Sequence, residues 1–193
     1  MPGVIVVEFT SLDGVVEDPD GAVGTPHGGW AARFGPEVFA GDKFDLGPLM
    51  ETGTLVFGRT TWELFADRWP LRTTPFADRM NAARKVVASR SLADARAWSG
   101  STVLAGDAID ALAARAASED LVVVGSTRLV HQLVERDLVD EYRLLVLPVV
   151  LGTGVRLFPE GGPELRLQQV ASSPAGAGQL LTYRRPAAPA PTA

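Results

Sequence analysis

The sequence contains no cysteine and only two histidines among its 193 residues. Without cysteine the chain can form no disulfide, no thiolate metal ligand and no cysteine nucleophile. His27 and His131 are isolated from each other in the sequence, so they do not build a histidine-rich metal centre. We therefore expect no metal site, and we interpret His131 as a residue on the surface of a helix.

Other absences narrow the class of protein. No apolar run approaches the roughly 18 residues of a membrane-spanning helix, and no basic segment precedes the first apolar run as it would in a signal peptide. The net charge is −5 without a basic cluster, which disfavours nucleic acid and acidic membrane surfaces as partners. The sequence has no G-x-G-x-x-G, G-x-x-x-x-G-K or G-x-S-x-G motif. These absences leave a cytoplasmic enzyme or binding protein.

The composition is that of a globular protein, with 46% apolar and 21% charged residues. A chain of this length can bury a sizeable core, and we expect a single domain over residues 1–185. The remaining residues, 186–193, are rich in proline and alanine and offer nothing to a core. We expect them to form a disordered tail.

The stretch 121–158 gives the clearest prediction of local structure. The run Leu121–Val124 is a short β-branched segment typical of a buried strand, and Gly125 follows it directly. Apolar residues then recur at helical spacing, and a second apolar run, Leu144–Leu151, comes after them. The order is strand, glycine turn, helix, strand. Such a turn presents free backbone N–H groups to an anion such as phosphate, although an ordinary strand-to-helix turn is the alternative.

Further elements are expected along the chain. Apolar runs predict strands at Val4–Phe9, Thr54–Phe57, Lys85–Ala88, Thr102–Leu104, Leu165–Val170 and Leu180–Tyr183. Helices are expected near Pro36–Leu49, at Thr60, which fits a capping box with Glu63, and after Asp107, whereas 67–79 is expected to be a loop. Strands separated by helices favour parallel pairing, and the last two strands favour an antiparallel edge.

Polar groups follow several of the predicted strands. Gly58, Arg59, Thr60 and Thr61 place a glycine, an arginine and two hydroxyls at a helix start, which suits a phosphate, and a capped helix with a solvated arginine is the alternative. Ser89 and Arg90 follow the third strand. The carboxyl ends of parallel strands are where ligands bind in open α/β sheets. These residues are therefore candidates for an anion site.

The first strand leads into a turn that contains Asp13. Its carboxylate could point into a ligand site, or it could bond to the backbone of its own turn. Residues 17–29 are expected to form a loop over the edge of the sheet. Aromatic residues follow, among them Trp30 and Phe34, and they could stack on a flat ligand or pack in the core.

In chain order, the segments SLDG, GRTTWE, KVVASRS, VVVGSTRLVHQL and LVDEYRLLVLPVVLGTGVRLF resemble the dihydrofolate reductase superfamily over roughly residues 4–183. The closer resemblance is to the branch similar to the C-terminal reductase domain of the bacterial riboflavin deaminase-reductase. It implies a three-layer α/β/α domain with a mixed, mostly parallel sheet that ends in antiparallel strands. It also implies NADPH as the hydride donor, a small-molecule substrate and a homodimer.

The resemblance assigns roles to residues by position. Gly58, Arg59, Thr60 and Thr61 correspond to the turn under the cofactor phosphates, Ser89 and Arg90 with Arg59 to the adenosine 2′-phosphate pocket, and Gly125, Ser126, Thr127 and Arg128 to the turn under the pyrophosphate. Asp13 resembles the acid that faces the substrate, so we expect it to bind substrate and act as the catalytic residue. We expect Trp30 to contact the substrate as well.

The sequence also departs from the pattern of these families. Gly35 stands where dihydrofolate reductases carry a carboxylate that holds the pterin, although Glu37 could substitute for it. Ser126 replaces the second glycine of the pyrophosphate turn, and no basic residue follows the SLDG turn. We therefore expect an NADPH-dependent reductase of a molecule other than dihydrofolate. A nucleotide-binding protein of the same fold without turnover is the alternative.

Overall fold

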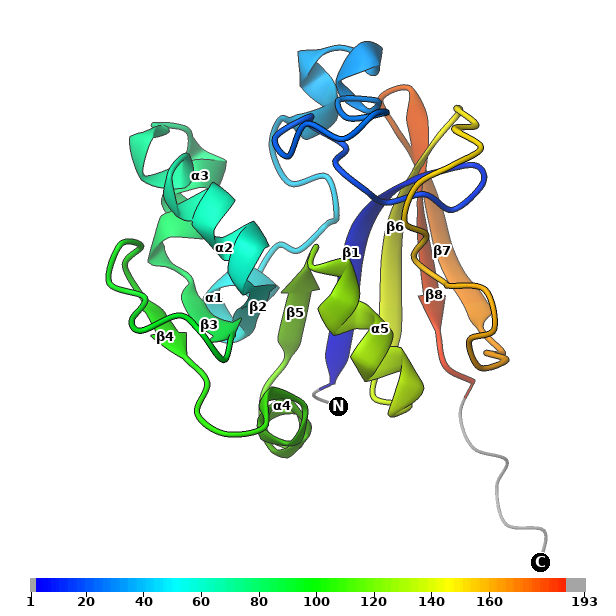
Figure 1. Ribbon diagram of the computed structural model, residues 1–193. Coiled ribbons are helices and arrows are strands. Elements are labelled where there is room, and N and C mark those ends of the chain that lie inside the picture. Colours follow the sequence, from blue (N-terminus) through cyan, green and yellow to red (C-terminus); the bar gives the residue numbers. More distant parts are fainter. Residues whose placement is uncertain (1–2, 187–193) are drawn as a thin grey trace, which may run out of the picture.

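The computed structural model describes residues 3–186, which form one eight-stranded sheet with helices on both faces (Figure 1). The strands are β1 (Val4–Ser11), β2 (Thr54–Gly58), β3 (Arg84–Ala88), β4 (Ser101–Val103), β5 (Leu121–Val124), β6 (Glu141–Leu147), β7 (Gln168–Ala175) and β8 (Gly178–Arg184). The helices are α1 (Leu49–Thr52), α2 (Arg59–Ala66), α3 (Pro75–Ala82), α4 (Ala108–Ala116) and α5 (Thr127–Glu135). Three 3₁₀ turns are η1 (Ala32–Phe34), η2 (Pro36–Phe39) and η3 (Trp69–Leu71).

The strands lie in the order β4-β3-β2-β5-β1-β6-β8-β7. The pairs from β4 to β6 are parallel, and β8 runs antiparallel to both β6 and β7. Crossover connections, most of which contain helices, return the chain to the same end of the sheet and so give parallel strands, whereas the short turn between β7 and β8 gives antiparallel ones. The predicted mixed, mostly parallel sheet with antiparallel C-terminal strands is confirmed.

Helices cover the two faces of the sheet separately. Val123 belongs to the core that contains apolar residues of α4 and α5, such as Leu112 and Leu133. Its neighbour Val122 belongs to the core on the other face, with side chains of α1, α2 and α3. Successive residues of a strand point to opposite faces, so a fully apolar β5 supplies both cores. The result is the predicted three-layer arrangement (Figure 1).

The prediction for the second apolar run of the 121–158 stretch was wrong in its boundaries. The run was predicted as a strand over Leu144–Leu151, but β6 begins at Glu141 and ends at Leu147. Pro148 follows, and its ring nitrogen has no hydrogen to donate to a neighbouring strand. β6 lies between β1 and β8, so both of its edges are paired.

The outer strands of the sheet are β4 and β7. β7 begins three residues later than the predicted Leu165–Val170 and continues to Ala175, because Leu165 and Leu167 instead pack against the core beneath α5. A register shift between Gln169 and Ala171 and a proline near its end interrupt β7. Irregularities of this kind discourage a free edge from pairing with another chain.

One helix prediction and one loop prediction were also wrong. The region predicted as a helix over Pro36–Leu49 contains the turn η2 and then irregular chain, because Gly41, Asp45 and Gly47 adopt positive φ angles of 71°, 50° and 45°. Left-handed residues interrupt a right-handed helix. Conversely, the expected loop over 67–79 contains η3 and most of α3.

The starts of α3 and α4 follow ordinary capping rules. The hydroxyl of Thr74 accepts a hydrogen bond from the N–H of Ala77 at 3.2 Å, and Pro75 occupies the first turn of α3. The carboxylate of Asp107 accepts hydrogen bonds from the N–H groups of Ile109 and Asp110. The predicted helix after Asp107 is therefore confirmed as α4.

Within residues 3–186 no helix has the length and apolar character needed to cross a membrane. The cytoplasmic location expected from the sequence stays a prediction. Of the predicted tail, residues 187–193 lie outside the described part of the chain.

Candidate functional site

The topology predicts a crevice at the carboxyl ends of β2 and β5. These strands are parallel neighbours, with Val56 opposite Val123. The helix that follows β2, α2, packs on one face of the sheet, and the helix that follows β5, α5, packs on the other. Two connections that leave neighbouring strands toward opposite faces open a crevice between them, which is the usual ligand position in α/β sheets.

The two glycine turns at this crevice are joined by one side chain. The backbone N–H of Gly58 donates to Oγ of Ser126 at 2.6 Å, and the same hydroxyl donates to Oγ1 of Thr61 at 2.9 Å. Ser126 adopts the left-handed conformation, with φ 65° and ψ 58°. That conformation costs a non-glycine residue about 1–2 kcal/mol, and the two hydrogen bonds offset the cost. Ser126 thereby fixes the β2–α2 turn to the β5–α5 turn.

The helices at the crevice begin differently from α3 and α4. No side chain caps the N-terminus of α2 or α5, and neither first turn contains an acidic residue. By contrast, side chains cap both α3 and α4. The first N–H groups of a helix have no partner within it and attract anions, so the two uncapped N-termini are open to a phosphate.

The predicted capping box of α2 is absent from the structure. The helix begins at Arg59 with Gly58 as its N-cap, so Thr60 lies inside the first turn. Glu63 does not reach back to the backbone, and its carboxylate contacts Nη1 of Arg59 at 3.2 Å. Because Gly58 has no side chain, the start of α2 stays open.

Both glycine turns have little room for a side chain. A Cβ atom built on Gly58 would lie 2.9 Å from Oγ and 3.0 Å from Cβ of Ser126. One built on Gly125, whose φ is 60°, would lie 3.3 Å from Cγ2 of Thr61. The close approach of these backbones leaves a cradle of N–H groups that a larger residue would disturb.

This packing predicts the effect of a Gly58→Ala substitution. The added methyl group is expected to displace the hydroxyl of Ser126, break its bond from the N–H of residue 58 and lower the free energy of unfolding by about 1–3 kcal/mol. Urea unfolding measures this loss. A Gly58→Ala/Ser126→Gly double variant is the matched control, because removal of the serine side chain makes room for the methyl group. Its loss should be smaller than the sum of the two single losses, and strict additivity would contradict the proposed clash.

The residues predicted to hold the 2′-phosphate directly follow two neighbouring strands, β2 and β3. Gly58 pairs with Ala88 in the parallel ladder, so Arg59 and the segment Ser89–Arg90 emerge side by side. The side chain of Arg59 is 48% exposed, and such an exposed ion pair with Glu63 is worth well under about 1 kcal/mol. Arg90 is exposed, and Oγ of Ser89 accepts hydrogen bonds from two following N–H groups. The arginines are thus free to turn toward a ligand.

The structure therefore gathers the predicted cofactor residues at one edge of the sheet. They are Gly58, Arg59, Thr60 and Thr61 after β2, Ser89 and Arg90 after β3, and Gly125, Ser126, Thr127 and Arg128 after β5. Three neighbouring parallel strands end there. Their roles toward a cofactor stay predictions.

Asp13 lies at the end of β1 and is held by hydrogen bonds. Its carboxylate accepts from Oγ of Ser11 at 2.7 Å, from the N–H of Leu151 at 3.1 Å and from the N–H of Gly152 at 2.8 Å. The bond from Ser11, supported by the backbone donors, lowers the pKa of Asp13 to about 2. An ionised carboxylate has no proton to give at neutral pH. These contacts anchor the segment after β6 to the end of β1, and the expected role of Asp13 toward a substrate stays a prediction.

Trp30 lies inside the protein. Its side chain has no exposed surface, and Nε1 donates to the carbonyl oxygen of Glu17 at 2.8 Å. Val38, Leu145 and Leu147 belong to the same apolar cluster. In this conformation Trp30 offers no surface to a substrate, and core packing, the alternative considered for the aromatic residues, describes its environment. The structure does not bring Trp30 together with the cofactor residues.

Glu8 is an acidic residue within the apolar strand β1, and no sequence motif assigns it a role. Glu8 is only 6% exposed, and Oε1 has no hydrogen-bond partner within the described part of the chain. Burial raises the pKa of Glu8 to about 8. The signal in the sequence was a single charged residue inside the run VIVVEF. A buried acid without a partner is unusual enough to mark a functional position.

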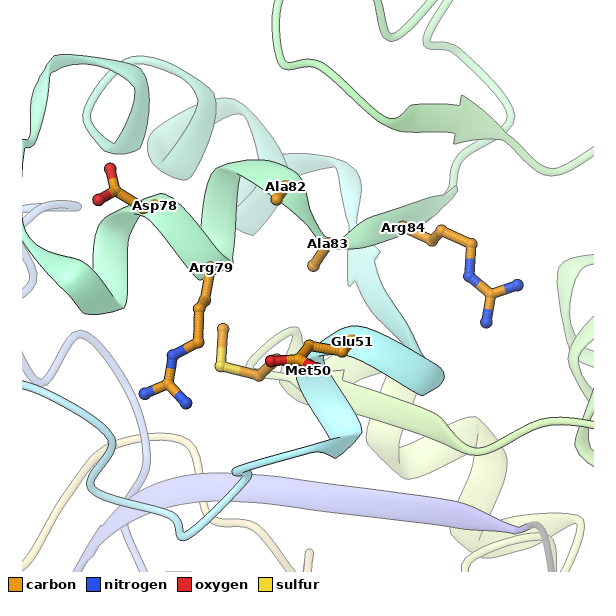
Figure 2. A pocket seen from close by; sticks show the side chains of 7 residues that line it. All are labelled: Met50, Glu51, Asp78, Arg79, Ala82, Ala83 and Arg84. Atoms are coloured by element: carbon orange, nitrogen blue, oxygen red, sulfur yellow. The ribbon is translucent and has the colours of Figure 1, made fainter.

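A separate hollow of about 490 Å³ lies between α1 and the C-terminal end of α3 (Figure 2). Its lining consists of Met50, Glu51, Asp78, Arg79, Ala82, Ala83 and Arg84. Arg84 is the first residue of β3, so the hollow lies at the amino ends of the parallel strands. The candidate site lies at their carboxyl ends, and the hollow is no part of it. Residues 3–186 also contain no group of three or more side chains arranged to hold a metal ion.

Comparison with known proteins identifies related sequences. The family described as the RibD C-terminal domain matches residues 2–181. The uncharacterized protein YwjB of Bacillus subtilis (strain 168) is 26% identical over 178 residues, which cover 91% of this chain and 93% of YwjB.

Solved structures share the fold at lower sequence identity. A protein of Shewanella sp. PV-4, provisionally assigned to riboflavin biosynthesis, has a TM-score of 0.68 and 23% identity, with 97% of this chain and 100% of that chain covered. The dihydrofolate reductase of Enterococcus faecalis, solved with NADP(H) and RAB-propyl, has a TM-score of 0.55 and 19% identity, with 95% and 96% covered. These likenesses show a dihydrofolate reductase-like fold.

Proposed function

The chain belongs to the RibD C-terminal domain family, and on that premise we propose that it is an NADPH-dependent reductase of a small molecule. The observation that carries the proposal is the pair of uncapped helix N-termini, α2 and α5, on neighbouring strands. The hydroxyl of Ser126 holds the two turns together. Two sets of free N–H groups beside exposed arginines suit the phosphates of a dinucleotide.

The order of the strands suggests how the cofactor would lie. Arg59, Ser89 and Arg90, after β2 and β3, would hold the adenosine 2′-phosphate. The N–H groups of Gly125–Arg128, after β5, would hold the pyrophosphate. The next strand is β1, so the nicotinamide end would lie there, close to the end of the strand that carries Asp13. The cofactor supplies a hydride when bound, and the residues of this chain bind and orient it.

The test of this function is cofactor oxidation with a panel of small carbonyl and imine compounds. We expect at least one compound to raise NADPH oxidation above the background measured without it. Tight NADPH binding without oxidation by any compound would favour the alternative, a nucleotide-binding protein of the same fold without turnover. Absence of NADPH binding would contradict both functions.

Dihydrofolate is not expected to be the substrate. Gly35, at the position where dihydrofolate reductases carry a carboxylate, has a φ of 94° and lies between two 3₁₀ turns, and Glu37 is exposed. Neither supplies a buried carboxylate to hold and protonate a pterin. Loss of a positioned proton donor slows a reaction by about 100-fold or more. NADPH oxidation with dihydrofolate measures this, and turnover at ordinary enzyme rates would contradict the expectation.

We also propose that the chain forms a C2 homodimer. β6 offers no free strand edge to a second copy, because it is paired on both sides. The proposal now rests on exposed apolar side chains beside the end of β1, among them Leu12 at 64% and Val150 at 68%. Light scattering should give twice the mass of one chain at micromolar protein. A Val150→Asp variant should shift the mass toward a monomer, and a parent protein that is already monomeric would contradict the proposal.

A further inference from the structure

Glu8 is a buried acid that none of the roles discussed above explains. Glu8 is 6% exposed, and its Oε1 has no hydrogen-bond partner within the described residues. Buried polar atoms nearly always have such a partner. The described part of the chain contains no ion pair to its carboxyl group. Leaving such a group without a partner destabilises the folded protein, so a benefit elsewhere is expected.

The position of Glu8 follows from the strand register. Val7 pairs with Val124, the last residue of β5, and Glu8 pairs with Leu144 on β6. Glu8 is therefore one residue beyond the last β1–β5 pair, level with the start of the Gly125–Ser126 turn. Neighbouring strands are about 4.8 Å apart, so the backbones of Glu8 and that turn lie close together.

The face of the sheet that carries Glu8 is also defined. Val4 and Val6 belong to the core that includes α5, and side chains alternate along a strand. Glu8 thus lies on the face of the sheet that α5 covers, close to the turn that opens α5. This is the side on which the pyrophosphate would meet the N-terminus of α5.

The protonation state of Glu8 determines what it can bind. Burial raises the pKa of its carboxyl group to about 8, so the group is mostly neutral at pH 7. A neutral carboxylic acid offers one O–H donor and one carbonyl acceptor side by side. The chemical group that matches this pair is a primary amide, which offers one carbonyl acceptor and N–H donors.

We propose that the carboxyl group of Glu8 hydrogen-bonds the carboxamide of the nicotinamide ring when the cofactor binds. The proposal rests on the proposed function, because it takes the pyrophosphate to lie on the β5–α5 turn. β1 is then the next strand along the sheet, and Glu8 is its buried polar group nearest that turn. The cofactor amide would supply the missing partner of Oε1.

Two ligands separate the nicotinamide end from the rest of the cofactor. NADPH carries the carboxamide, whereas 2′-phospho-ADP-ribose lacks the nicotinamide and keeps the phosphates. Isothermal titration of a Glu8→Leu variant should show NADPH affinity at least about tenfold below that of the parent, with 2′-phospho-ADP-ribose affinity unchanged within about twofold. A Glu8→Gln variant keeps one donor and one acceptor, and it should retain NADPH affinity within about threefold.

A further ligand tests the contact in the parent protein itself, without any substitution. Reduced 3-acetylpyridine adenine dinucleotide phosphate carries a methyl group where NADPH has the amide NH₂. The parent should bind it several-fold more weakly than NADPH, and the Glu8→Leu variant should bind the two equally. Equal binding of the two cofactors by the parent would overturn the proposal, as would an unchanged ratio of NADPH to 2′-phospho-ADP-ribose affinity in Glu8→Leu. Failure of the parent to bind 2′-phospho-ADP-ribose at all would instead overturn the proposed nucleotide site.

Discussion

The parent protein is expected to lose folding stability as the pH rises from about 4.5 to about 8, and a Glu8→Gln variant is expected to lose much of that dependence. The pKa of Glu8 is about 8 in the folded protein and near 4.5 in the unfolded chain. Between these values the folded state binds the extra proton, so raising the pH favours unfolding. The contribution is complete below pH 4.5 and lost above pH 8.

The expected size of this effect is large for a single side chain. A difference of one pKa unit corresponds to about 1.4 kcal/mol, so the loss attributable to Glu8 is on the order of 4 kcal/mol over this pH range. Urea unfolding at pH 5 and at pH 8.5 measures it in both proteins. The difference between parent and variant isolates Glu8, because the other titratable groups are common to both. Equal pH dependence in the two proteins would show that Glu8 is not a buried neutral acid.

NADPH is expected to bind more tightly than NADH, by about tenfold to a thousandfold. Arg59 and Arg90 leave adjoining strand ends, where a 2′-phosphate would gain charge-assisted hydrogen bonds worth roughly 1.5–3 kcal/mol each before solvent exposure reduces them. No acidic residue directly follows β3 to hold the ribose of NADH. An Arg59→Ala variant should therefore lose most of the preference by binding NADPH more weakly.

Fluorescence titration with both cofactors measures this preference. Glu63→Ala is the matched control, because Glu63 pairs with Arg59 on the surface and its removal leaves the arginine free for the phosphate. Its NADPH affinity should equal or exceed that of the parent. Equal affinity of the parent for both cofactors, or unchanged NADPH binding by Arg59→Ala, would contradict the assignment of the 2′-phosphate pocket.

Much of the fold could be predicted because the signals are local. The β-branched run Leu121–Val124 is a strand with the predicted bounds, and Asp107 caps the helix predicted after it. The predicted order of strands separated by helices gave the parallel part of the sheet. The apolar pattern of a strand and the capping residue of a helix depend on neighbours in the sequence. Both can therefore be interpreted without the tertiary structure.

The errors in the fold arose where a single residue interrupts an otherwise apolar or helical pattern. The apolar residues after Leu147 suggested a longer β6, but Pro148 ends the strand, and the backbone of Leu12 instead donates to the carbonyl of Val149. Asp45 adopts a left-handed conformation that the sequence alone did not predict. It is one of the residues that interrupt the expected helix over 36–49.

In the candidate site, local features could be predicted from the sequence, and contacts between distant segments could not. The glycine turns after β2 and β5 could be recognised from sequence, whereas the bridge that Ser126 makes between them joins residues 65 or more positions apart. Glu8 gave only the weak signal of an acid within an apolar strand, since the lack of a partner is a property of its tertiary surroundings. The contacts of Asp13 with Leu151 and Gly152 likewise depend on a segment far along the chain.

The central claim is that the turns after β2 and β5 hold the phosphates of NADPH. The crystal structure of the complex with NADPH tests it most directly. We expect the pyrophosphate oxygens within hydrogen-bond distance of the N–H groups of Gly125–Arg128 and the 2′-phosphate beside Arg59. A cofactor bound in the hollow between α1 and α3, or with its phosphates away from both glycine turns, would contradict the claim.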